Sequence, residues 1–244
     1  MRDDQIDLCG RVDFLRDEGM PLLDRKARFS FACAGCGDCC RGREDIVLSG
    51  YDLWRIAQRL DLPPKIVARG YCRSSIGPVS GLPVLRLAPV KEQRNNCPFL
   101  DGGRCAIHDA EPLVCALYPL AQEISREGET AYFLQPTQCG GQRVEARVED
   151  YLALYGTLER EPLDVRWAMA CMDLEDRVAG LDLAPVLRRR MQDKLWQALY
   201  FGYDPHRPWR EQLEANLLWL EGELDKLAAY QERLAIKKQM DKID

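Results

Sequence analysis

The chain of 244 residues is 46% hydrophobic and 30% charged, a composition that suits a globular protein with a sizeable apolar core. Its formal net charge of −5 provides no basic field that would attract nucleic acid, so we expect no nucleic-acid partner. The sequence contains no apolar run long enough to span a membrane, and its first residues lack the apolar centre of a secretion signal. We therefore expect a soluble, cytoplasmic protein without a membrane partner.

The unusual feature of the composition is its eleven cysteines. Nine of them lie between residues 33 and 139, eight in closely related motifs and the ninth, Cys72, isolated, and beyond residue 140 there is only Cys171. In a reducing compartment, clustered cysteines bind metal or carry out redox chemistry more often than they form disulfides. We therefore expect the eight to be metal ligands: Cys33, Cys36, Cys39, Cys40, Cys97, Cys105, Cys115 and Cys139.

The uneven distribution of cysteine also predicts the domain organisation. We expect an N-terminal lead-in over residues 1–28, a cysteine-cluster metal-binding domain over 29–141, and a helical region over 142–244. The predicted fold class is α+β, mostly α, with an irregular, metal-nucleated N-terminal domain followed by a helical C-terminal region.

Within the cysteine-rich part, Ser49 and Asp52 are spaced as a helix cap, and apolar residues at helical spacing follow them. This pattern predicts a capped amphipathic helix. Residues 82–90 alternate enough for a short strand, and residues 121–136 predict a hairpin that turns near Gly128. The connections between these elements are rich in glycine and proline. We expect metal ligation to supply stability that so irregular a chain lacks.

The C-terminal part is expected to be helical. The pattern predicts a helix over 143–156, a second one ending at Gly180, and a third one after Asp182. The last helix is the longest, because leucines at alternating spacings of four and three run from Leu213 to Leu234. This heptad pattern favours packing within the chain's own bundle. A dimer or a protein partner that pairs with the helix is the alternative.

Residues 31–40 read FACAGCGDCC and carry the strongest chemical signal. Cys33, Cys36 and Cys39 form a C-x-x-C-x-x-C run, which can present three thiolates from one loop to a soft or borderline metal. A fourth ligand must come from elsewhere. Cys97 is the natural candidate because a proline follows it, as in bacterial ferredoxin-type cluster ligation.

The adjacent pair of Cys39 and Cys40 complicates a single site. In an extended chain, neighbouring side chains point to opposite sides, so one of the two is expected to belong to a second centre. Cys40 would complete a second set of four with Cys105, Cys115 and Cys139. This four-plus-four partition is a hypothesis, and the assignment of individual cysteines stays open.

Taken together, these motifs resemble the YkgJ-type cysteine-cluster family, which is described as having a zinc- or iron-chelating domain. The resemblance covers roughly residues 29–141 and implies that the eight cysteines are the functional residues. It rests on these segments: Phe31-x-Cys33-x-x-Cys36-Gly37-x-Cys39-Cys40, Cys97-Pro98-Phe99-Leu100, Cys105-x-Ile107-His108, Pro112-x-x-Cys115-x-x-Tyr118-Pro119 and Cys139-x-Gly141.

The chain also departs from that family. Relatives commonly carry arginine at the positions of Glu111 and Ala116, so a use of those arginines toward an anionic partner would be lost or altered here. His108 often corresponds to tyrosine in relatives, which favours a hydrogen-bonding role beside the ligands over direct ligation.

The metal and its role stay open at this point. Structural zinc sites usually pair two C-x-x-C motifs, whereas the three-cysteine loop with a remote Cys-Pro favours an iron–sulfur cluster of the 4Fe-4S type, with zinc as the alternative. We expect a structural, electron-transfer or redox role. The alternatives are a zinc-stabilised interaction module and, because flagellin lysine methylases are similar in their cysteine motif, a metal-dependent enzyme that methylates protein lysine. Whether the chain is an enzyme stays open.

The remaining candidates have ordinary explanations. Cys171 falls on the apolar stripe of a helix and is expected in the core. Cys9 and Cys72 are expected to be spare thiols, and His206 to be a loop residue. The arginines at 188–190 are expected to face solvent.

Overall fold

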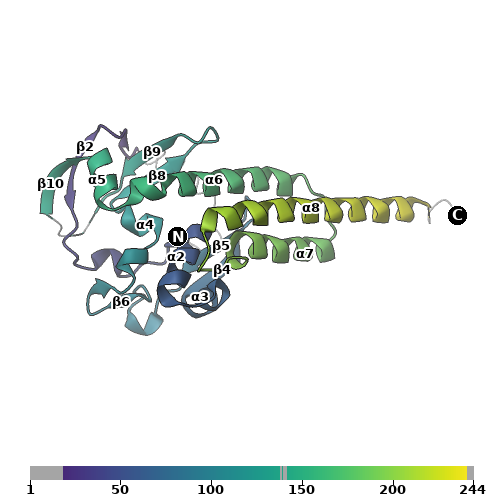
Figure 1. Cartoon of the computed structure of the whole chain (residues 1–244), viewed down its shortest axis with the longest axis horizontal. Coiled ribbons are helices and arrows are strands. Elements are labelled where there is room, and N and C mark those ends of the chain that lie inside the picture. The colour runs from purple at the N-terminus through teal and green to yellow at the C-terminus, as the bar shows by residue number, and fades with distance from the viewer. Residues whose placement is uncertain (1–18, 138, 140–141, 241–244) are drawn as a thin grey trace.

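The structure, a computed structural model, describes residues 19–137, 139 and 142–240. Cys9 and Gly141 lie outside the described residues. Small sheets and short turns occupy one end of the molecule, and long helices extend from it toward the C-terminus (Figure 1). The predicted α+β class with a helical C-terminal region is confirmed.

The predicted capped helix is α2 (Gly50–Leu60), and its cap forms as expected. The backbone N–H of Asp52 donates to Ser49 Oγ over 3.0 Å, and the backbone N–H of Ser49 donates to Asp52 Oδ2 over 2.9 Å. These two bonds satisfy donors that a helix start otherwise leaves unpaired. Helix α3 (Pro64–Tyr71) follows and begins with proline, which suits the first helical turn.

A three-stranded antiparallel sheet packs beside these helices in the order β3-β5-β4. Its strands are β3 (Val47–Leu48), β5 (Pro83–Leu87) and β4 (Cys72–Ile76). All residues of the central strand β5 are buried, because both of its edges are paired and both of its faces are covered. The strand predicted within 82–90 is thus confirmed.

A second sheet has the order β1-β9-β8, also antiparallel. Strands β8 (Leu120–Ile124) and β9 (Thr130–Leu134) form the predicted hairpin, and β1 (Leu22–Leu23) pairs with β9. The turn contains Gly128 at φ +80°, a conformation that favours glycine. The hairpin prediction is confirmed.

The prediction of a helix over 143–156 is wrong for the first part of this segment and correct for the second. Its first part is strand β10 (Gln142–Arg147), and only α5 (Val148–Leu154) is helical. Strand β10 pairs antiparallel with β2 (Arg28–Ala32), so a ladder with a segment more than 100 residues earlier overrides the local helical pattern. The short elements around the cysteines are η2 (Asp38–Cys40), η3 (Lys91–Gln93), β6 (Leu100–Asp101), β7 (Arg104–Cys105), η4 (His108–Ala110) and α4 (Leu113–Ala116).

The C-terminal helices lie side by side. They are α6 (Thr157–Ala179), α7 (Pro185–Trp196) with its π-helical continuation η5 (Gln197–Phe201), and α8 (Trp209–Met240), which extends beyond α6 and α7 (Figure 1). Ion pairs between their side chains join α6 to α8 and α7 to α8. No helix among these and the other described segments is both long and apolar enough to cross a membrane.

Two apolar cores hold the molecule together. The main core combines side chains from α2, α3 and β5 with side chains from α6, α7, η5 and α8. Its fully buried members include Leu48, Leu53, Ile56, Ala57, Val67, Leu82, Leu195, Leu199, Leu213, Leu220 and Leu224. The main core thus draws on both sides of the boundary predicted near residue 141, and that boundary stays a prediction.

The small core lies between β2, β8, β9 and α5. Its buried members are Phe29, Phe31, Leu117, Leu120, Tyr132, Val148, Tyr151 and Leu152. Phe29 packs edge-on against Tyr151, with ring centroids 5.1 Å apart. Aromatic pairs of this kind add to the free energy gained from burial alone.

The predictions for the C-terminal helices are largely met. Leu213, Leu217, Leu220, Leu224 and Leu227 are buried within the chain, and Leu234 is partly buried against the same core. This part of the heptad seam is therefore used internally. A protein partner for α8 stays a prediction.

A buried ion network ties α2 to α6. Arg160 donates from Nη2 to Asp52 Oδ1 and from Nε to Asp164 Oδ2, each over 2.7 Å. All three side chains are at most 6% exposed. Removing one partner of such a network leaves an uncompensated buried charge, which is strongly destabilising.

Candidate metal centre

The cysteine loop leaves β2 and closes with the tight 3-10 turn η2. Gly37 precedes this turn at φ +73°, and a Cβ atom there would lie 2.5 Å from the carbonyl oxygen of Gly103. Only glycine satisfies both conditions. This close contact holds the cysteine loop against the turn between β6 and β7.

Five cysteines form what we call the inner thiol group: Cys39, Cys40, Cys97, Cys105 and Cys115. The backbone N–H of Cys97 donates to the Cys40 carbonyl oxygen over 2.8 Å, and the two thiols are hydrogen-bonded. The Cys39 and Cys40 sulfurs lie 3.9 Å apart. Cys105 and Cys115 interact electrostatically with these thiols and with each other. Four separate segments of the chain, around η2, before β6, in β7 and in α4, thus supply one group of sulfurs.

The expectation that Cys39 and Cys40 point apart is wrong. It assumed an extended chain, whereas the two residues lie in a 3-10 turn. In that turn their sulfurs come within 3.9 Å of each other. Both cysteines can therefore serve the same centre.

Hydrogen bonding and burial shift the pKa values of these thiols. A hydrogen bond with Cys40 is the main reason why the pKa of Cys39 is raised. The hydrogen bond from Cys39 lowers the pKa of Cys40, but the bond that Cys40 makes to Cys97 and burial outweigh it and raise that pKa to about 12. The same bond lowers the pKa of Cys97. Thiolates are the form that binds metal, so a metal must displace protons from this group.

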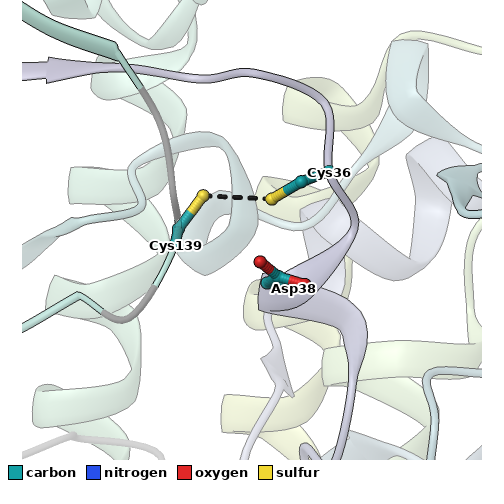
Figure 2. Close-up of side chains that lie close together, drawn as sticks. All are labelled: Cys36, Asp38 and Cys139. Atoms are coloured by element: carbon teal, nitrogen blue, oxygen red, sulfur yellow. Dashed lines mark hydrogen bonds between the residues drawn. The ribbon is translucent and has the colours of Figure 1, made fainter.

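Cys36 and Cys139 form a second group, which we call the outer pair. Their sulfurs lie 3.1 Å apart, and both side chains are half-buried (Figure 2). A carboxylate oxygen of Asp38 lies within 4.8 Å of both sulfurs. Asp38 Oδ1 also accepts a hydrogen bond from Arg41 Nη1 over 2.6 Å. Sequence reasoning missed Asp38, although its place inside the cysteine loop was a usable signal.

The ladder between β2 and β10 explains the outer pair. Its register sets Ala32 opposite Gln142, so the loop that leaves β2 and the segment that enters β10 start from neighbouring positions. The backbone N–H of Cys139 donates to Thr137 Oγ1 over 3.0 Å, which fixes the approach to the strand. The four-plus-four partition had placed Cys36 and Cys139 in different sets, and the structure groups them together.

Cys33 is exposed, unlike the other candidate ligands. Its sulfur accepts the backbone N–H of Gly35 over 3.4 Å. Since Cys33 stands three residues before Cys36 on the same loop, it is a candidate to extend the ligand set of the outer pair.

Glu111 lies beside the inner thiol group and interacts electrostatically with Cys105 and Cys115. Burial raises the pKa of Glu111, against the opposing effects of His108 and nearby arginines. His108 Nδ1 lies 3.1 Å from Glu111 Oε2, which matches the hydrogen-bonding role expected of His108. This chain thus places a carboxyl group next to the thiols.

The remaining features lie away from the two groups. Cys171 is 1% exposed in the main core, as predicted. Burial raises the pKa of Cys72, which lies in β4, to about 12. A cavity of about 500 Å³ between α7 and α8 is lined by Leu187, Arg190, Asp193, Lys194, Glu223, Lys226, Leu227 and Tyr230, and by none of the cysteines.

Residues 32–140 match the family described as "CxxCxxCC: Putative zinc- or iron-chelating domain". This segment is similar to that family. The match contains all eight predicted ligands and confirms the resemblance drawn from their spacing. No curated protein and no solved structure matches the chain.

The donor atoms of this segment fit the metals that the family description names. Sulfur donors select zinc, iron and iron–sulfur clusters, whereas magnesium and calcium prefer oxygen donors. The inner thiol group is made of sulfur donors, with the Glu111 carboxyl beside it. The outer pair adds two further sulfurs and the Asp38 carboxylate. Both groups therefore suit zinc or iron.

Proposed function

We propose that this chain is a cytoplasmic metal-cluster protein whose inner thiol group binds an iron–sulfur cluster of the 4Fe-4S type, with a structural or electron-transfer role. The observation that carries the proposal is the arrangement of the five inner sulfurs, of which no three lie within 4.8 Å of one another. A reducing compartment suits a chain with so many thiols.

The distances between ligand sulfurs differ between a site for a single ion and a site for a cluster. Four thiolates around a single zinc, each about 2.3 Å from it in a tetrahedron, place their sulfurs roughly 3.8 Å apart. In the described part of the chain, three ligand atoms lie within 4.8 Å of one another only at Cys36, Asp38 and Cys139. No three of the inner sulfurs meet that condition, although those of Cys39 and Cys40 lie 3.9 Å apart. A four-iron cluster takes its cysteines on separate irons, so such an arrangement suits it better.

The number of inner thiols supports the same proposal. Five cysteines make up the group, one more than a four-coordinate zinc site uses. Cys97 precedes proline, as in ferredoxin-type ligation. A cluster bound by four of the five would join segments that are distant in the sequence.

Partial exposure makes an electron-transfer role chemically reasonable. Cys39, Cys40, Cys105 and Cys115 are neither fully buried nor fully exposed, so a cluster held there would be shielded from bulk water yet close to the surface. Solvent exposure and hydrogen bonds to the sulfurs set the potential of such clusters. A purely structural role would use the same ligands.

The outer pair supports a second, smaller candidate: a single zinc or iron ion. Two sulfurs 3.1 Å apart are closer to the spacing around one ion than to that around a cluster. Asp38 would supply a third donor, and Cys33 is the candidate for a fourth.

Anaerobic purification followed by iron, sulfide and zinc analysis tests the proposal. We expect a brown protein whose visible absorption fades with a chelator or in air. Cys97→Ser and Cys115→Ser should abolish the colour, whereas Cys72→Ser, which changes a cysteine outside both groups, should retain it. Colourless protein with stoichiometric zinc would contradict the cluster. An enzymatic role such as that of flagellin lysine methylases would further require S-adenosylmethionine binding, which calorimetry measures.

A further inference from the structure

The outer pair has a geometry that metal binding alone does not require. Cys36 and Cys139 are 103 positions apart in the sequence, yet their sulfurs lie 3.1 Å from each other. Figure 2 shows the two side chains pointing toward one another from separate segments, with Asp38 to one side. Two thiols placed in this way can form a covalent bond with little movement of the backbone.

The cysteines of the outer pair are also accessible to a small oxidant. Both cysteines are half-buried, in contrast to Cys97 and Cys171, which are buried in the main core. Oxidation of cysteine follows exposure, so small oxidants reach the outer pair more easily than they reach those two. The pair lies beside the small core, and Cys139 packs against it, so the two segments are held in place while they react.

Cys39 and Cys40 give an internal comparison. Their sulfurs are 3.9 Å apart, but the residues are adjacent, so a disulfide between them would close a small strained ring. A bond between Cys36 and Cys139 would instead close a long loop. Long loops lose the most conformational entropy in the unfolded chain when they are cross-linked, which favours the bond in the folded protein.

The geometry points to a second role for the outer pair: Cys36 and Cys139 form a redox-active dithiol that a peroxide oxidises to a disulfide, and metal binding and disulfide formation exclude each other there. This inference rests on the proposed function, because it assigns to the outer pair both the ion proposed above and a competing reaction.

The reaction balances as follows. One thiolate attacks a peroxide oxygen, the O–O bond breaks, and the products are a sulfenic acid and hydroxide, which takes up a proton to become water. The second thiol then attacks the sulfenic sulfur, the S–S bond forms, and a second water leaves. Two thiols and one hydrogen peroxide thus give one disulfide and two waters. A small dithiol reductant reverses the change.

Exclusion between metal and disulfide follows from the donor atoms. The thiolate is the metal ligand, and a disulfide sulfur has no thiolate to offer. A bound ion holds both sulfurs of the outer pair and should protect them from peroxide. Oxidation should in turn release the ion from the outer pair. It should not affect a cluster bound by the inner thiol group.

The test uses the full chain in two states, metal-free and loaded with zinc, each treated with equimolar hydrogen peroxide. After alkylation and digestion, mass spectrometry should find a peptide that links Cys36 to Cys139 in most metal-free molecules and should lose it after treatment with dithiothreitol. Formation should be at least tenfold slower in the loaded protein. Cys36→Ser and Cys139→Ser should abolish the linked peptide, and Cys72→Ser, as the matched control, should retain it.

Two results would overturn the inference: alkylated Cys36 and Cys139 in the metal-free protein after oxidation, or equal rates with and without zinc. The visible spectrum of anaerobic protein, recorded on the same preparation, separates this from the proposed function. A coloured protein without the linked peptide would refute only the dithiol. A chain that forms the linked peptide and is protected by zinc but never takes up iron would refute the iron–sulfur cluster and leave the dithiol supported.

Discussion

The inner thiol group and the outer pair rest on different cores. Cys97 is part of the main core, and Cys40, Cys105 and Cys115 pack against it. Cys139 packs against the small core, which is built on β2, β8, β9 and α5. Each group of sulfurs therefore lies where loops meet a packed scaffold.

The two cores differ in size and in the elements that supply their side chains. The main core collects side chains from four long helices as well as from β5, whereas the small core has eight buried members. Apolar burial stabilises roughly in proportion to area, so the main core can hold its shape without help from metal. The helices therefore depend less on metal for their stability than the loops that carry the ligands do.

Metal removal should have the largest effect, and it should be local. Structural metal sites bind with free energies on the order of 10 kcal/mol, which is folding free energy where the site does not form without metal. We expect a chelator to raise hydrogen exchange strongly in residues 39–48 and 96–118, which carry the inner thiol group. Protection in α6, α7 and α8 should remain. Exchange measured by mass spectrometry checks this pattern, and equal exchange in both states would show that the loops fold on their own contacts.

Phe31→Ala should destabilise the small core and leave the packing of the main core unchanged. Phe31 is 6% exposed and packs edge-on against Tyr118, with ring centroids 6.0 Å apart. Truncating a buried phenylalanine typically costs about 3–5 kcal/mol. We expect a loss of this size in denaturant unfolding and a lower yield of the Cys36–Cys139 disulfide. Phe31→Leu, the conservative control, should cost less and keep the disulfide. If both variants retain the inner cluster, the inner thiol group does not depend on the small core. Loss of the cluster would show that it does.

The pH dependence of stability should come in part from the main core. Asp52 accepts hydrogen bonds from Ser49 and from the backbone N–H of Leu113 in addition to Arg160, whereas Asp164 is bound through Arg160. Burial is the main reason why the pKa of Asp164 is raised from its ordinary 3.8 to about 6; the charge of Asp52 adds to this effect and Arg160 opposes it. The folded state therefore holds this proton more tightly than the unfolded state.

The sign of the effect follows from linkage. The stabilisation is complete below about pH 4, falls as the pH rises toward 6, and is lost above that. We expect wild type to lose about 1–3 kcal/mol relative to Asp164→Asn between pH 4 and pH 7. Urea unfolding of both proteins across this window measures the difference. A constant difference would mean that Asp164 keeps an ordinary pKa.

Local signals explain how much of the fold could be predicted. Ser49 and Asp52 cap α2 through contacts within one turn, and Gly128 turns its hairpin through its own backbone conformation. Such features need no distant partner. Strand β10 needed β2, and residues 143–147 therefore looked helical when only their own pattern was considered.

The same cause limited prediction of the site. Spacing identified the cysteines that the structure gathers, but their grouping depends on which segments meet in space. Cys139 joins Cys36 because of the ladder between β2 and β10, and Cys40 reaches Cys97 through a backbone hydrogen bond between distant segments. Asp38 stands inside the cysteine loop, but only the fold shows that its carboxylate lies within 4.8 Å of the sulfurs of Cys36 and Cys139.

Asp38→Asn should have the smallest effect on stability and still discriminate between the two groups. Asp38 pairs with Arg41 over 2.6 Å, and both side chains are 46% exposed. Exposed pairs of this kind contribute roughly 0–1 kcal/mol, so the unfolding midpoint should hardly move. Asp45→Asn is a matched control, because Asp45 pairs with Arg43 over the same 2.6 Å and is 47% exposed, yet it is not part of the outer pair's donor set.

If Asp38 is a ligand of the outer pair, the two variants should differ in metal binding although they agree in stability. Loss of its charge should weaken zinc at the outer pair about tenfold, or about 1.4 kcal/mol, while Asp45→Asn leaves it unchanged. The visible band of the inner cluster should be the same in both variants, because the inner thiol group keeps all of its sulfurs. Competition titration with a zinc indicator measures the affinity. Equal affinities would remove Asp38 from the ligand set and reduce the outer site to its sulfurs.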